Sequence, residues 1–506
     1  MGVFIGIDLG TSNSCIAWFD KTGRPQIIPN SLGENITPSV VAIDSENQED
    51  KIEDSVVVGT YAYETWGFEP EKAQARFKKK MHEKDLKLKM GDKEFTPSQL
   101  SAFVLKKLVS DASAVLNEEI EEVVISIPAN FPNEAREATI NAGNLAGLKV
   151  NFIVNEPTAA ALYYSFLRDE EEDLNGIYAV YDLGGGTFDF SLIEVKQKEI
   201  KILASNGIQN CGGDDFDRAV YNLLVEKFNL TSKETLTDRD FNLTHAEKAK
   251  KALTGKKSTT VRVGRELLTI SREEFENLIN SFVIQTKVTV EETLKEAKIN
   301  FDDVNEVFLV GGSTRVPIIQ DEIQKIFNKK PVQTVNPDEV VALGAALYAA
   351  AKGDQTKLNE ASRMSIEKVK VKDISNKNYG TIALDPNGIE EINSVLIVKG
   401  AELPASRTKT FYTVSDNQDF IYCRITESIN KEIDPEWVEI VWSGELLLSD
   451  PTQVKMGDEI EVTYSYDINQ IMQCEFREVK SGVAKKVNLD LNKFKQTDNI
   501  EDIKII

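Results

Sequence analysis

The feature that most constrains the fold of this chain is a short turn that occurs twice, each time directly after an apolar, strand-like run. The first copy reads GIDLGTSNS over residues 6–14 and carries Asp8; the second reads YDLGGGTFD over residues 181–189 and carries Asp182. Glycine lets a backbone bend sharply and leaves amide hydrogens free to approach a phosphate closely. The repeat therefore predicts two similar halves of one domain that hold a single ligand between them.

A triphosphate with a magnesium ion fits such a pair of turns. Backbone amides and the hydroxyls of Thr11 and Thr187 would contact phosphate oxygens. Asp8 and Asp182 would face the waters of Mg²⁺, an ion that favours a few carboxylates and keeps several waters. One such turn alone is as compatible with an ordinary hairpin, whereas two copies favour phosphate binding. The chain lacks the GxxxxGK[ST] and GxGxxG patterns, which disfavours the P-loop and dinucleotide-binding folds.

The rest of the chain predicts an α/β domain followed by a β domain. The first part alternates short apolar β runs with helical stretches, as in α/β domains whose helices cover their sheets. Further on, helical periodicity gives way to short strands separated by turns, which predicts a β-sandwich of roughly seven or eight strands. We expect an α/β nucleotide-binding domain over 1–355, a linker over 356–373, a β-sandwich over 374–495 and a tail over 496–506.

The acidic composition disfavours two classes of partner. With 82 acidic and 59 basic residues among 506, the formal net charge is −23 at pH 7, which repels nucleic acid and anionic lipid. The N-terminus lacks the basic start and apolar core of a signal peptide, and no apolar run is long enough to span a membrane. These features predict a cytoplasmic protein that binds neither nucleic acid nor membrane. The two histidines leave little scope for histidine chemistry.

Two further motifs, NEPTAAA over residues 155–161 and GGSTRVP over residues 311–317, complete a set of four. Together with the two turns, they resemble the ATPase domain of the heat-shock protein 70 family, with the motifs in the family's order from residue 3 to about residue 352. The resemblance implies an actin-like, two-lobed ATPase domain built from duplicated ribonuclease-H-like halves, followed by a β-sandwich. It also implies an ATP-dependent chaperone that hydrolyses ATP, with ATP or ADP, Mg²⁺ and K⁺ as candidate ligands.

The resemblance also assigns roles to particular residues. It implies that Lys78 lies beside the γ-phosphate and that Glu156 and Asp182 lie near the metal and the attacking water. Thr187, on phosphate, completes this catalytic set, and Asp8 and Asp182 would hold the metal through water. The implied nucleotide-binding residues are Asp8, Gly10, Thr11, Ser12, Asn13, Gly184, Gly185, Gly186, Gly212, Gly213, Asp214, Glu247, Lys250, Lys251, Thr254, Gly311, Gly312, Ser313, Arg315 and Asp338.

Some of these positions have an ordinary structural explanation as well. Lys78 lies in a run of three lysines, and charged runs usually form a solvated face. The segment AEKAKKAL over residues 246–253 resembles the family's adenosine-facing helix, with Glu247 on the ribose and Lys250 on the nucleoside. Its lysine–glutamate spacing suits surface pairing on a helix equally well. Lys251 stands where the family usually has arginine, and an ammonium stacks on a purine less well than a guanidinium, so we expect weaker adenine binding.

The β domain resembles the family's peptide-binding domain less closely. Residues 396–418 and 464–472 carry this likeness, which places Phe411, Val414 and Ile421 toward a groove for extended peptide. The same side chains suit the core of a sandwich equally well. The implied partners are unfolded or extended client peptides, a J-domain co-chaperone and a nucleotide exchange factor.

The chain departs from the family at three places. The family's apolar interdomain linker is here VKVK over residues 369–372, Phe152 replaces an arginine before NEPTAAA, and the sequence ends at Ile506, where the family continues into a helical lid. We therefore expect weak coupling to a J-domain partner and a chaperone without a lid. A small-molecule kinase and an actin-like filament subunit are the alternatives on this ATPase fold. A kinase needs an acceptor pocket, however, and a filament subunit needs no appended β domain.

Overall fold

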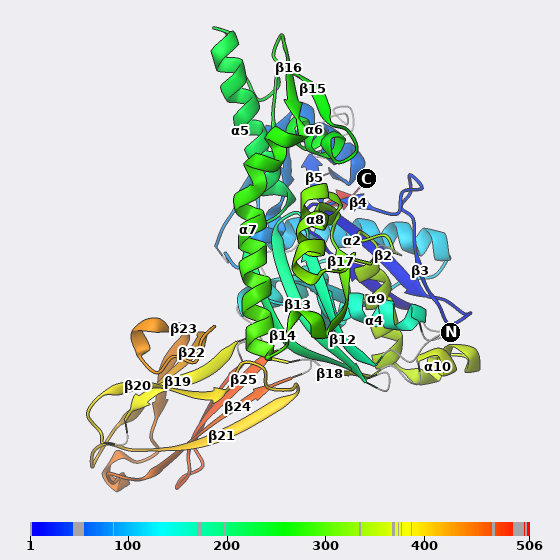
Figure 1. Ribbon diagram of the computed structural model, residues 1–506. Coiled ribbons are helices and arrows are strands. Elements are labelled where there is room, and N and C mark those ends of the chain that lie inside the picture. Colours follow the sequence, from blue (N-terminus) through cyan, green and yellow to red (C-terminus); the bar gives the residue numbers. More distant parts are fainter. Residues whose placement is uncertain are drawn as a thin grey trace. The chain divides into compact units, whose positions relative to one another are not determined.

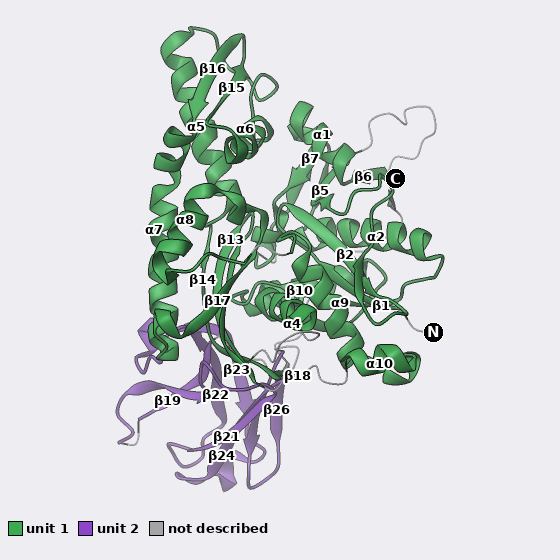
Figure 2. Ribbon diagram, turned by 45° about the vertical axis from the view of Figure 1, so that its right-hand side comes forward, with its two compact units in different colours: residues 1–371, 494–506 green, residues 372–493 purple. Residues whose placement is uncertain are grey.

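The computed structural model of the chain is shown as a ribbon in Figure 1. It describes residues 3–43, 55–83, 85–168, 175–196, 199–332, 335–366, 370–372, 374–375, 377–385, 387–467, 471–488, 500 and 503–505. The chain divides into two compact units (Figure 2). Unit 1 comprises residues 1–371 and 494–506, and unit 2 comprises residues 372–493. The second unit is thus inserted between two parts of the first.

Unit 1 contains two sheets with matching connections. In the first, β1 pairs antiparallel with β2 and parallel with β10, and the order is β11-β10-β1-β2-β3, with β4 on β2. In the second, β12 pairs antiparallel with β13 and parallel with β17, and the order is β17-β12-β13-β14-β18. This repetition confirms the predicted pair of similar halves. The strands are β1 (Phe4–Asp8), β2 (Asn13–Phe19), β3 (Pro25–Ile27), β4 (Thr37–Pro38), β10 (Glu122–Ile127), β11 (Lys149–Asn155), β12 (Gly176–Leu183), β13 (Thr187–Lys196), β14 (Glu199–Gln209), β17 (Val304–Val310) and β18 (Lys370–Lys372).

Two alanine-rich helices, α4 (Glu156–Arg168) and α9 (Val340–Lys352), pack against each other where the two halves meet. Helix α9 contacts β1 and β2, and α4 contacts β12 and β13. The crossing is close, because a Cβ at Gly344 would lie 1.8 Å from the carbonyl oxygen of Ala159. The small side chains of the alanines in the NEPTAAA motif therefore allow the close packing of α4 on α9 that joins the two halves.

Smaller elements surround these two sheets. Helix α2 begins after Thr96, whose side chain forms a capping box with Gln99. Strands β5, β6 and β7 form one small sheet, β8 pairs with β9, and β15 pairs with β16. The bounds are β5 (Val40–Ile43), β6 (Ser55–Val58), β7 (Ala73–Ala75), β8 (Leu88–Met90), β9 (Lys93–Phe95), β15 (Ser258–Val263), β16 (Glu266–Ser271), β27 (Lys504–Ile505), α1 (Thr60–Phe68), α2 (Pro97–Leu116), α3 (Asn133–Leu145), α5 (Gly213–Thr231), α6 (Leu243–Gly255), α7 (Arg272–Ala297), α8 (Pro317–Phe327), α10 (Glu360–Ile366), η1 (Pro70–Lys72), η2 (Phe77–Lys80), η3 (Phe301–Asp303), η4 (Gly312–Arg315) and η5 (Gln355–Lys357).

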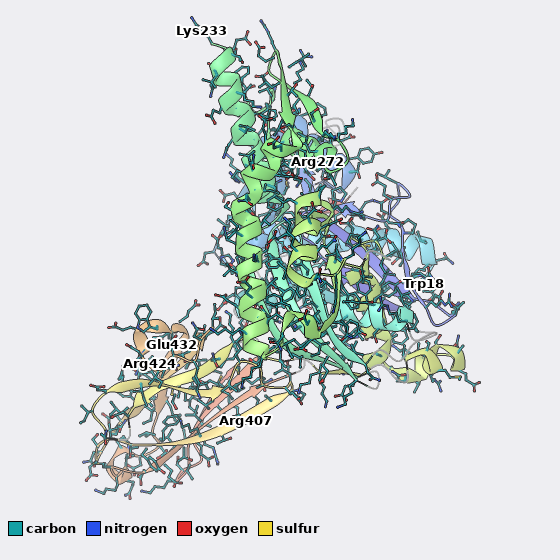
Figure 3. The ribbon with its side chains drawn as sticks, in the orientation of Figure 1. Trp18, Lys233, Arg272, Arg407, Arg424 and Glu432 are labelled. Carbon is teal, nitrogen blue, oxygen red and sulfur yellow. The ribbon has the colours of Figure 1, made fainter. Side chains whose placement is uncertain are left out.

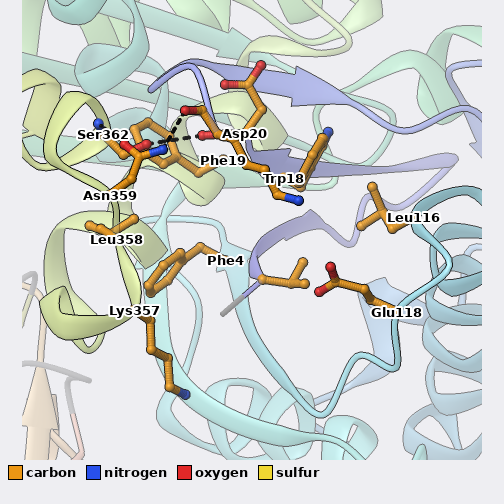
Figure 4. A pocket seen from close by; sticks show the side chains of 12 residues that line it. Phe4, Trp18, Phe19, Asp20, Leu116, Glu118, Lys357, Leu358, Asn359 and Ser362 are labelled. Atoms are coloured by element: carbon orange, nitrogen blue, oxygen red, sulfur yellow. Dashed lines mark hydrogen bonds between the residues drawn. The ribbon is translucent and has the colours of Figure 1, made fainter. Parts of the chain in front are cut away.

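The first part of the expected linker over 356–373 folds onto unit 1 instead. Helix α10 follows η5 beside the turn after β2, where the side-chain amide of Asn359 donates to the carbonyl oxygen of Lys21 at 2.7 Å (Figure 4). Leu358 and Ile366 are buried. Two apolar side chains in an otherwise polar stretch suffice to dock the helix, and that signal is too weak to distinguish it from a linker in the sequence.

The segments on either side of unit 2 also form strands of unit 1. Residues 370–372 of the VKVK segment form β18 at the edge of the second sheet, while residue 369 lies outside the described residues. Lys372 is exposed and Val371 is half-buried, so the strand forms without burial of the Lys372 side chain. Residues 504–505, expected in a tail over 496–506, form β27 and pair with β6.

Unit 2 is a β-sandwich, as the sequence predicts. Its sheets have the orders β20-β19-β22-β23 and β21-β24-β25-β26. Along β22, Cys423 and Ile425 are buried, whereas Phe420 and Tyr422 are exposed, so side chains alternate between the core and the surface. The bounds are β19 (Asn378–Leu384), β20 (Glu391–Ile397), β21 (Ala405–Tyr412), β22 (Phe420–Ser428), β23 (Glu439–Leu447), β24 (Glu459–Tyr466), β25 (Met472–Glu478), β26 (Ala484–Asn488), η6 (Pro435–Trp437) and η7 (Pro451–Gln453).

Candidate nucleotide-binding site

The two glycine-rich turns meet inside unit 1. Asp8 ends β1 and Thr187 begins β13, so each turn joins two antiparallel strands. A Cβ at Gly185 would lie 2.0 Å from Oγ of Ser12, so only glycine fits where the turns touch. The pocket at this point is lined, among others, by Asp8, Gly10, Thr11, Ser12, Asn13, Lys78, Glu156, Asp182, Gly184, Gly185, Gly186, Thr187, Gly311, Gly312 and Asp338.

A second pocket adjoins the first, because Ser12, Gly312 and Asp338 line both. Its other walls come from the start of α5, from α6 and from the turn after β17. They include Gly213, Glu247, Lys250, Lys251, Thr254, Ser313 and Arg315. Of the expected nucleotide-binding residues, Gly212 and Asp214 line neither of these two pockets. Gly212 packs on the backbone of the second turn instead.

Buried acids surround Lys78. Its Nζ lies 2.8 Å from Oε1 of Glu156, and its side chain is only 4% exposed, so this lysine does not belong to a solvated face. Burial raises the pKa of Asp8 and that of Asp189 to about 7, and the negative charge of Glu156 is the second cause of both shifts. The same two causes raise the pKa of Asp182 well above its ordinary value. A bound cation would favour the ionised form of all these acids.

A magnesium ion fits this set of residues. Oδ2 of Asp182 is buried and has no hydrogen-bond partner among the described residues, while Oδ1 of Asp8 accepts a hydrogen bond from Oγ of Ser126 at 2.7 Å. Mg²⁺ binds through one or two carboxylates and keeps waters and substrate phosphates as its other ligands. Within the part of the chain that the structure describes, no group of three or more His, Cys, Asp or Glu forms a complete protein cage. The site therefore suits a metal that arrives with its substrate.

The short helix η2 explains why one lysine of the run points inward. Phe77 and Lys78 are buried, whereas Lys80, in the same turn, is exposed. The burial of Phe77 fixes the orientation of the turn, and the Nζ of Lys78 lies 5.6 Å from the centre of the Phe131 ring. Packing of one aromatic residue thus selects which lysine reaches the acids.

Helices α5 and α6 form the other side of the site. Lys250 donates through Nζ to the carbonyl oxygen of Gly213 at 2.9 Å and pairs with Oδ1 of Asp217 at 2.8 Å. Lys251 pairs with Glu247 at 2.7 Å, and the Lys251 side chain is 62% exposed. Glu247 is buried while Lys251 is not. Glu247 and Lys250 therefore face inward, and Lys251 lies at the rim of the pocket.

The end of α6 is held by Arg272, labelled in Figure 3 where α7 begins. Its Nε donates to the carbonyl oxygen of Leu253 at 2.8 Å, and its Nη2 donates to that of Thr254 at 3.0 Å. Carbonyl groups in the last turn of a helix lack partners within the helix. The guanidinium satisfies two of them and fixes the helix that carries the adenosine-facing candidates.

Arg76, which no sequence motif indicated, joins elements from the two halves of unit 1. Its backbone is in the left-handed region with a φ of 61°. Its Nε lies 2.7 Å from Oδ1 of Asp214, its Nη2 lies 3.1 Å from Oδ2 of Asp217, and its guanidinium carbon lies 4.8 Å from the centre of the Trp66 ring. These partners lie far apart in the sequence, so no local pattern indicates them. Asp214, expected to bind nucleotide, is thus engaged by Arg76.

Two more residues of the site were missed. Asp189 is buried and accepts a hydrogen bond from Nδ2 of Asn130 at 2.9 Å; it closes the second copy of the repeated turn, so the motif itself could have indicated it. The hydroxyl of Tyr63 donates to Oε2 of Glu247 at 2.8 Å. No sequence pattern around Tyr63 points to that contact.

The three groove candidates of unit 2 differ in their surroundings. Phe411 and Ile421 are partly buried and pack against the core of the sandwich. Val414 is 53% exposed. Phe411 and Ile421 therefore belong to the core of the sandwich, and Val414 is the groove candidate whose side chain is available to a ligand.

Phe152 occupies an apolar setting. Its ring lies 6.1 Å from that of Tyr348 in an edge-to-face arrangement, which joins β11 to α9. An arginine at this position would present a guanidinium to the ring of Tyr348.

No helix in the described part of the chain is long and apolar enough to cross a membrane.

Comparisons with known proteins identify the family of the chain. The sequence model of the family described as Hsp70 protein matches residues 4–505. The chain is 36% identical over 497 residues to the chaperone protein DnaK of Thermotoga petrophila, an alignment that covers 94% of this chain and 78% of the relative. It is equally similar to the DnaK chaperones of Thermotoga maritima and Thermotoga neapolitana, with the same identity and coverage. The chain belongs to the Hsp70 family.

Proposed function

We propose that this chain hydrolyses ATP between the two halves of unit 1 and uses that reaction to control how unit 2 holds extended segments of client polypeptides. As a member of the Hsp70 family, it is an ATP-dependent molecular chaperone and an ATP hydrolase, with ATP or ADP and Mg²⁺ as ligands. The observation that supports the detailed assignment is the pocket where both repeated turns meet the buried Lys78–Glu156 pair.

The phosphate groups would lie between the two turns. The hydroxyls of Thr11 and Thr187 and the backbone amides of the glycines would donate to phosphate oxygens. Mg²⁺, when bound, neutralises charge on the phosphates, and Asp8 and Asp182 would hold its waters. Lys78 would offset the negative charge of the transferred phosphoryl group. Its own position is set by Glu156 at 2.8 Å.

Glu156 has a second proposed role. It begins α4 directly after β11, so a strand-to-helix junction places its carboxylate among the other acids. A carboxylate there accepts a hydrogen bond from a water and orients it toward the γ-phosphate. Phosphoryl transfer depends mostly on such positioning and on charge neutralisation. The residues present are therefore sufficient for hydrolysis without covalent catalysis by the protein.

The adenosine would lie in the adjoining pocket. Glu247 faces the ribose in this assignment, Lys250 faces the nucleoside, and the turn Gly311–Arg315 covers the other side. Arg315 pairs with Asp338 through Nη2 at 2.8 Å, which holds the guanidinium at the pocket wall. Hydrolysis without any sugar acceptor distinguishes this assignment from a small-molecule kinase. Family membership disfavours both the kinase and the filament alternatives.

Client peptide would bind to unit 2 at the connection between β21 and β22. Several apolar side chains there are exposed rather than packed in the core. They are Tyr412 at 60%, Val414 at 53%, Phe420 at 42% and Tyr422 at 50%. Exposed apolar side chains beside strand ends suit an extended peptide that pairs through its backbone.

The test measures ATP turnover and peptide binding together. Purified chain should hydrolyse ATP with Mg²⁺ alone and should turn over faster when unfolded peptide is added. Val414→Asp should weaken binding of a labelled unfolded peptide about tenfold while unstimulated turnover stays unchanged. The control is Ile433→Asp, an apolar residue that is 64% exposed in the connection between β22 and β23. Release of ADP that requires a small-molecule acceptor would contradict the proposal.

The family relationship supports co-chaperones in general, and we propose a J-domain co-chaperone and a nucleotide exchange factor as the particular partners. We also propose a cytoplasmic location and a K⁺ ion beside Mg²⁺. Phe152, packed on Tyr348, and Lys372, exposed in β18, differ from the family at two places that bear on J-domain coupling. Stimulation by a J-domain partner should accordingly be weak.

A further inference from the structure

A strand from the far end of the chain covers an edge in unit 1. Strand β27 pairs parallel with β6, with Lys504 opposite Ser55 and Ile505 opposite Val56, in a sheet of order β27-β6-β5-β7. Figure 2 shows the C-terminus beside β6. Residues 500 and 503–505 are here called the strap. Without the strap, β6 would be the unpaired edge of this sheet.

The strap also fills part of the core. Ile500 is fully buried in the hydrophobic cluster that contains Val56 and Phe103, and Ile503 and Ile505 pack against the same cluster. The backbone amide of Ile503 donates to the carbonyl oxygen of Ile500 at 3.1 Å, which closes a turn just before β27. An extended peptide binds to the edge of a sheet through backbone hydrogen bonds and through apolar side chains that are buried beside it, and the strap makes both kinds of contact.

The two connections to unit 2 reach different halves of unit 1. The chain enters unit 2 from β18, in the sheet whose strands β12 and β13 carry Asp182 and Thr187. It leaves unit 2 toward the strap, in the sheet whose strand β7 leads directly into Arg76 and Lys78. One connection therefore ends on each side of the nucleotide pocket.

We propose that the edge of β6 is a binding site for one extended segment, the chain's own strap, and that the strap is a displaceable second anchor of the sandwich. Because the strap is tethered, its effective concentration at β6 is high, so it outcompetes the same sequence added as a free peptide. Loss of the strap opens the site to that peptide. Pairing of the strap with β6 is independent of the ATPase assignment.

The experiment uses the full chain with Ile500→Asp and Ile505→Asp, which place charges in the apolar cluster and on the paired strand. The probe is a fluorescent peptide of residues 494–506, with a second peptide that carries the same two substitutions as its control. We expect the probe to bind the variant at least ten times more tightly than it binds the unaltered chain. The charged peptide should bind neither. The control variant is Ile284→Asp, an isoleucine of α7 that is 53% exposed, and it should behave like the unaltered chain.

A second measurement covers the case in which the doubly charged variant misfolds. In the milder Ile500→Ala chain, amides of residues 55–58 should exchange with deuterium at least tenfold faster than in the unaltered chain, and the free peptide should restore their protection. Equal peptide binding by variant and unaltered chain, or unchanged exchange at β6, would overturn the proposal. So would a dimer of the unaltered chain that becomes monomeric in the variant, because the strap would then lie on a second copy.

Discussion

Replacing Lys78 by methionine isolates the charge of this lysine from its packing. Methionine keeps an unbranched apolar stem of similar length, so the change mainly removes the ammonium that lies 2.8 Å from Glu156. Removing one partner of a buried ion pair typically costs about 3–5 kcal/mol in free energy of unfolding. Turnover should fall by about 10²–10³-fold, with ATP affinity nearly unchanged, because the charge acts mainly in the transition state.

The loss of stability should depend on pH. In the folded chain, burial above all raises the pKa of Asp8 and that of Asp189 from the ordinary value of 3.8 to about 7. The contribution of these two acids to folded stability is therefore full at pH values below their ordinary pKa and is lost as pH rises toward 7, because they must then ionise. Lys78 favours their ionised forms, so without it both pKa values should rise further. A further rise of about one unit in each would make the variant's deficit about 2 kcal/mol larger at pH 8 than at pH 5.5.

Hydrogen exchange along β12 in unit 1, measured at both pH values, reports this difference without interference from unit 2. Lys80→Met is the matched control, because Lys80 lies in the same short helix and is exposed. Its stability should change by less than about 0.5 kcal/mol at either pH. A Lys78→Met deficit that is equal at pH 5.5 and pH 8 would show that the lysine acts through packing, and the electrostatic account of the site would be wrong.

Three further outcomes are expected. Asp182→Ala should reduce Mg²⁺-dependent turnover by at least about 100-fold, since its buried, unpaired oxygen is the candidate that holds metal waters; near-normal turnover in a steady-state assay would refute this assignment. Lys251→Arg should tighten ADP binding about threefold in calorimetry, because a guanidinium at the rim stacks better on adenine, and weaker binding would contradict that role. Labelled client peptide should dissociate at rates that differ about fivefold or less between ATP and ADP, because Lys372 stays exposed in β18 and adds little apolar contact. A hundredfold difference would show strong coupling by another route.

The residues that the sequence predicted well lie in local patterns. Asp8 and Thr187 each belong to a strand–turn–strand unit of a few residues, and the structure brings both turns into one pocket. Lys78 was ambiguous because the run of lysines carries no sign of which one faces inward. The burial of its neighbour Phe77 decides that question, and the sequence alone does not show this burial.

The features that the sequence did not reveal depend on distant contacts. Arg76 meets Asp214 and Asp217 only because the fold brings two remote helical segments together. Helix α10 carries few apolar residues, so its polar appearance suggested a linker. The strap is rich in isoleucine, but the polar run over residues 496–499 before it suggested a tail. The core that receives Ile500 is built from strands and helices near the N-terminus, and no periodicity near residue 500 indicates it.

The pairing of β27 with β6 has a consequence for synthesis of the chain. The two strands are about 450 residues apart, and contacts of such separation form late because a long loop must first be closed. At typical translation rates of about 5–20 residues per second, β6 leaves the ribosome roughly 20–90 seconds before β27 is made. During that interval the growing chain presents an open, valine-rich edge strand, which is a site for unwanted pairing. The half of unit 1 that carries Lys78 therefore reaches its final structure only after the sandwich has been synthesised.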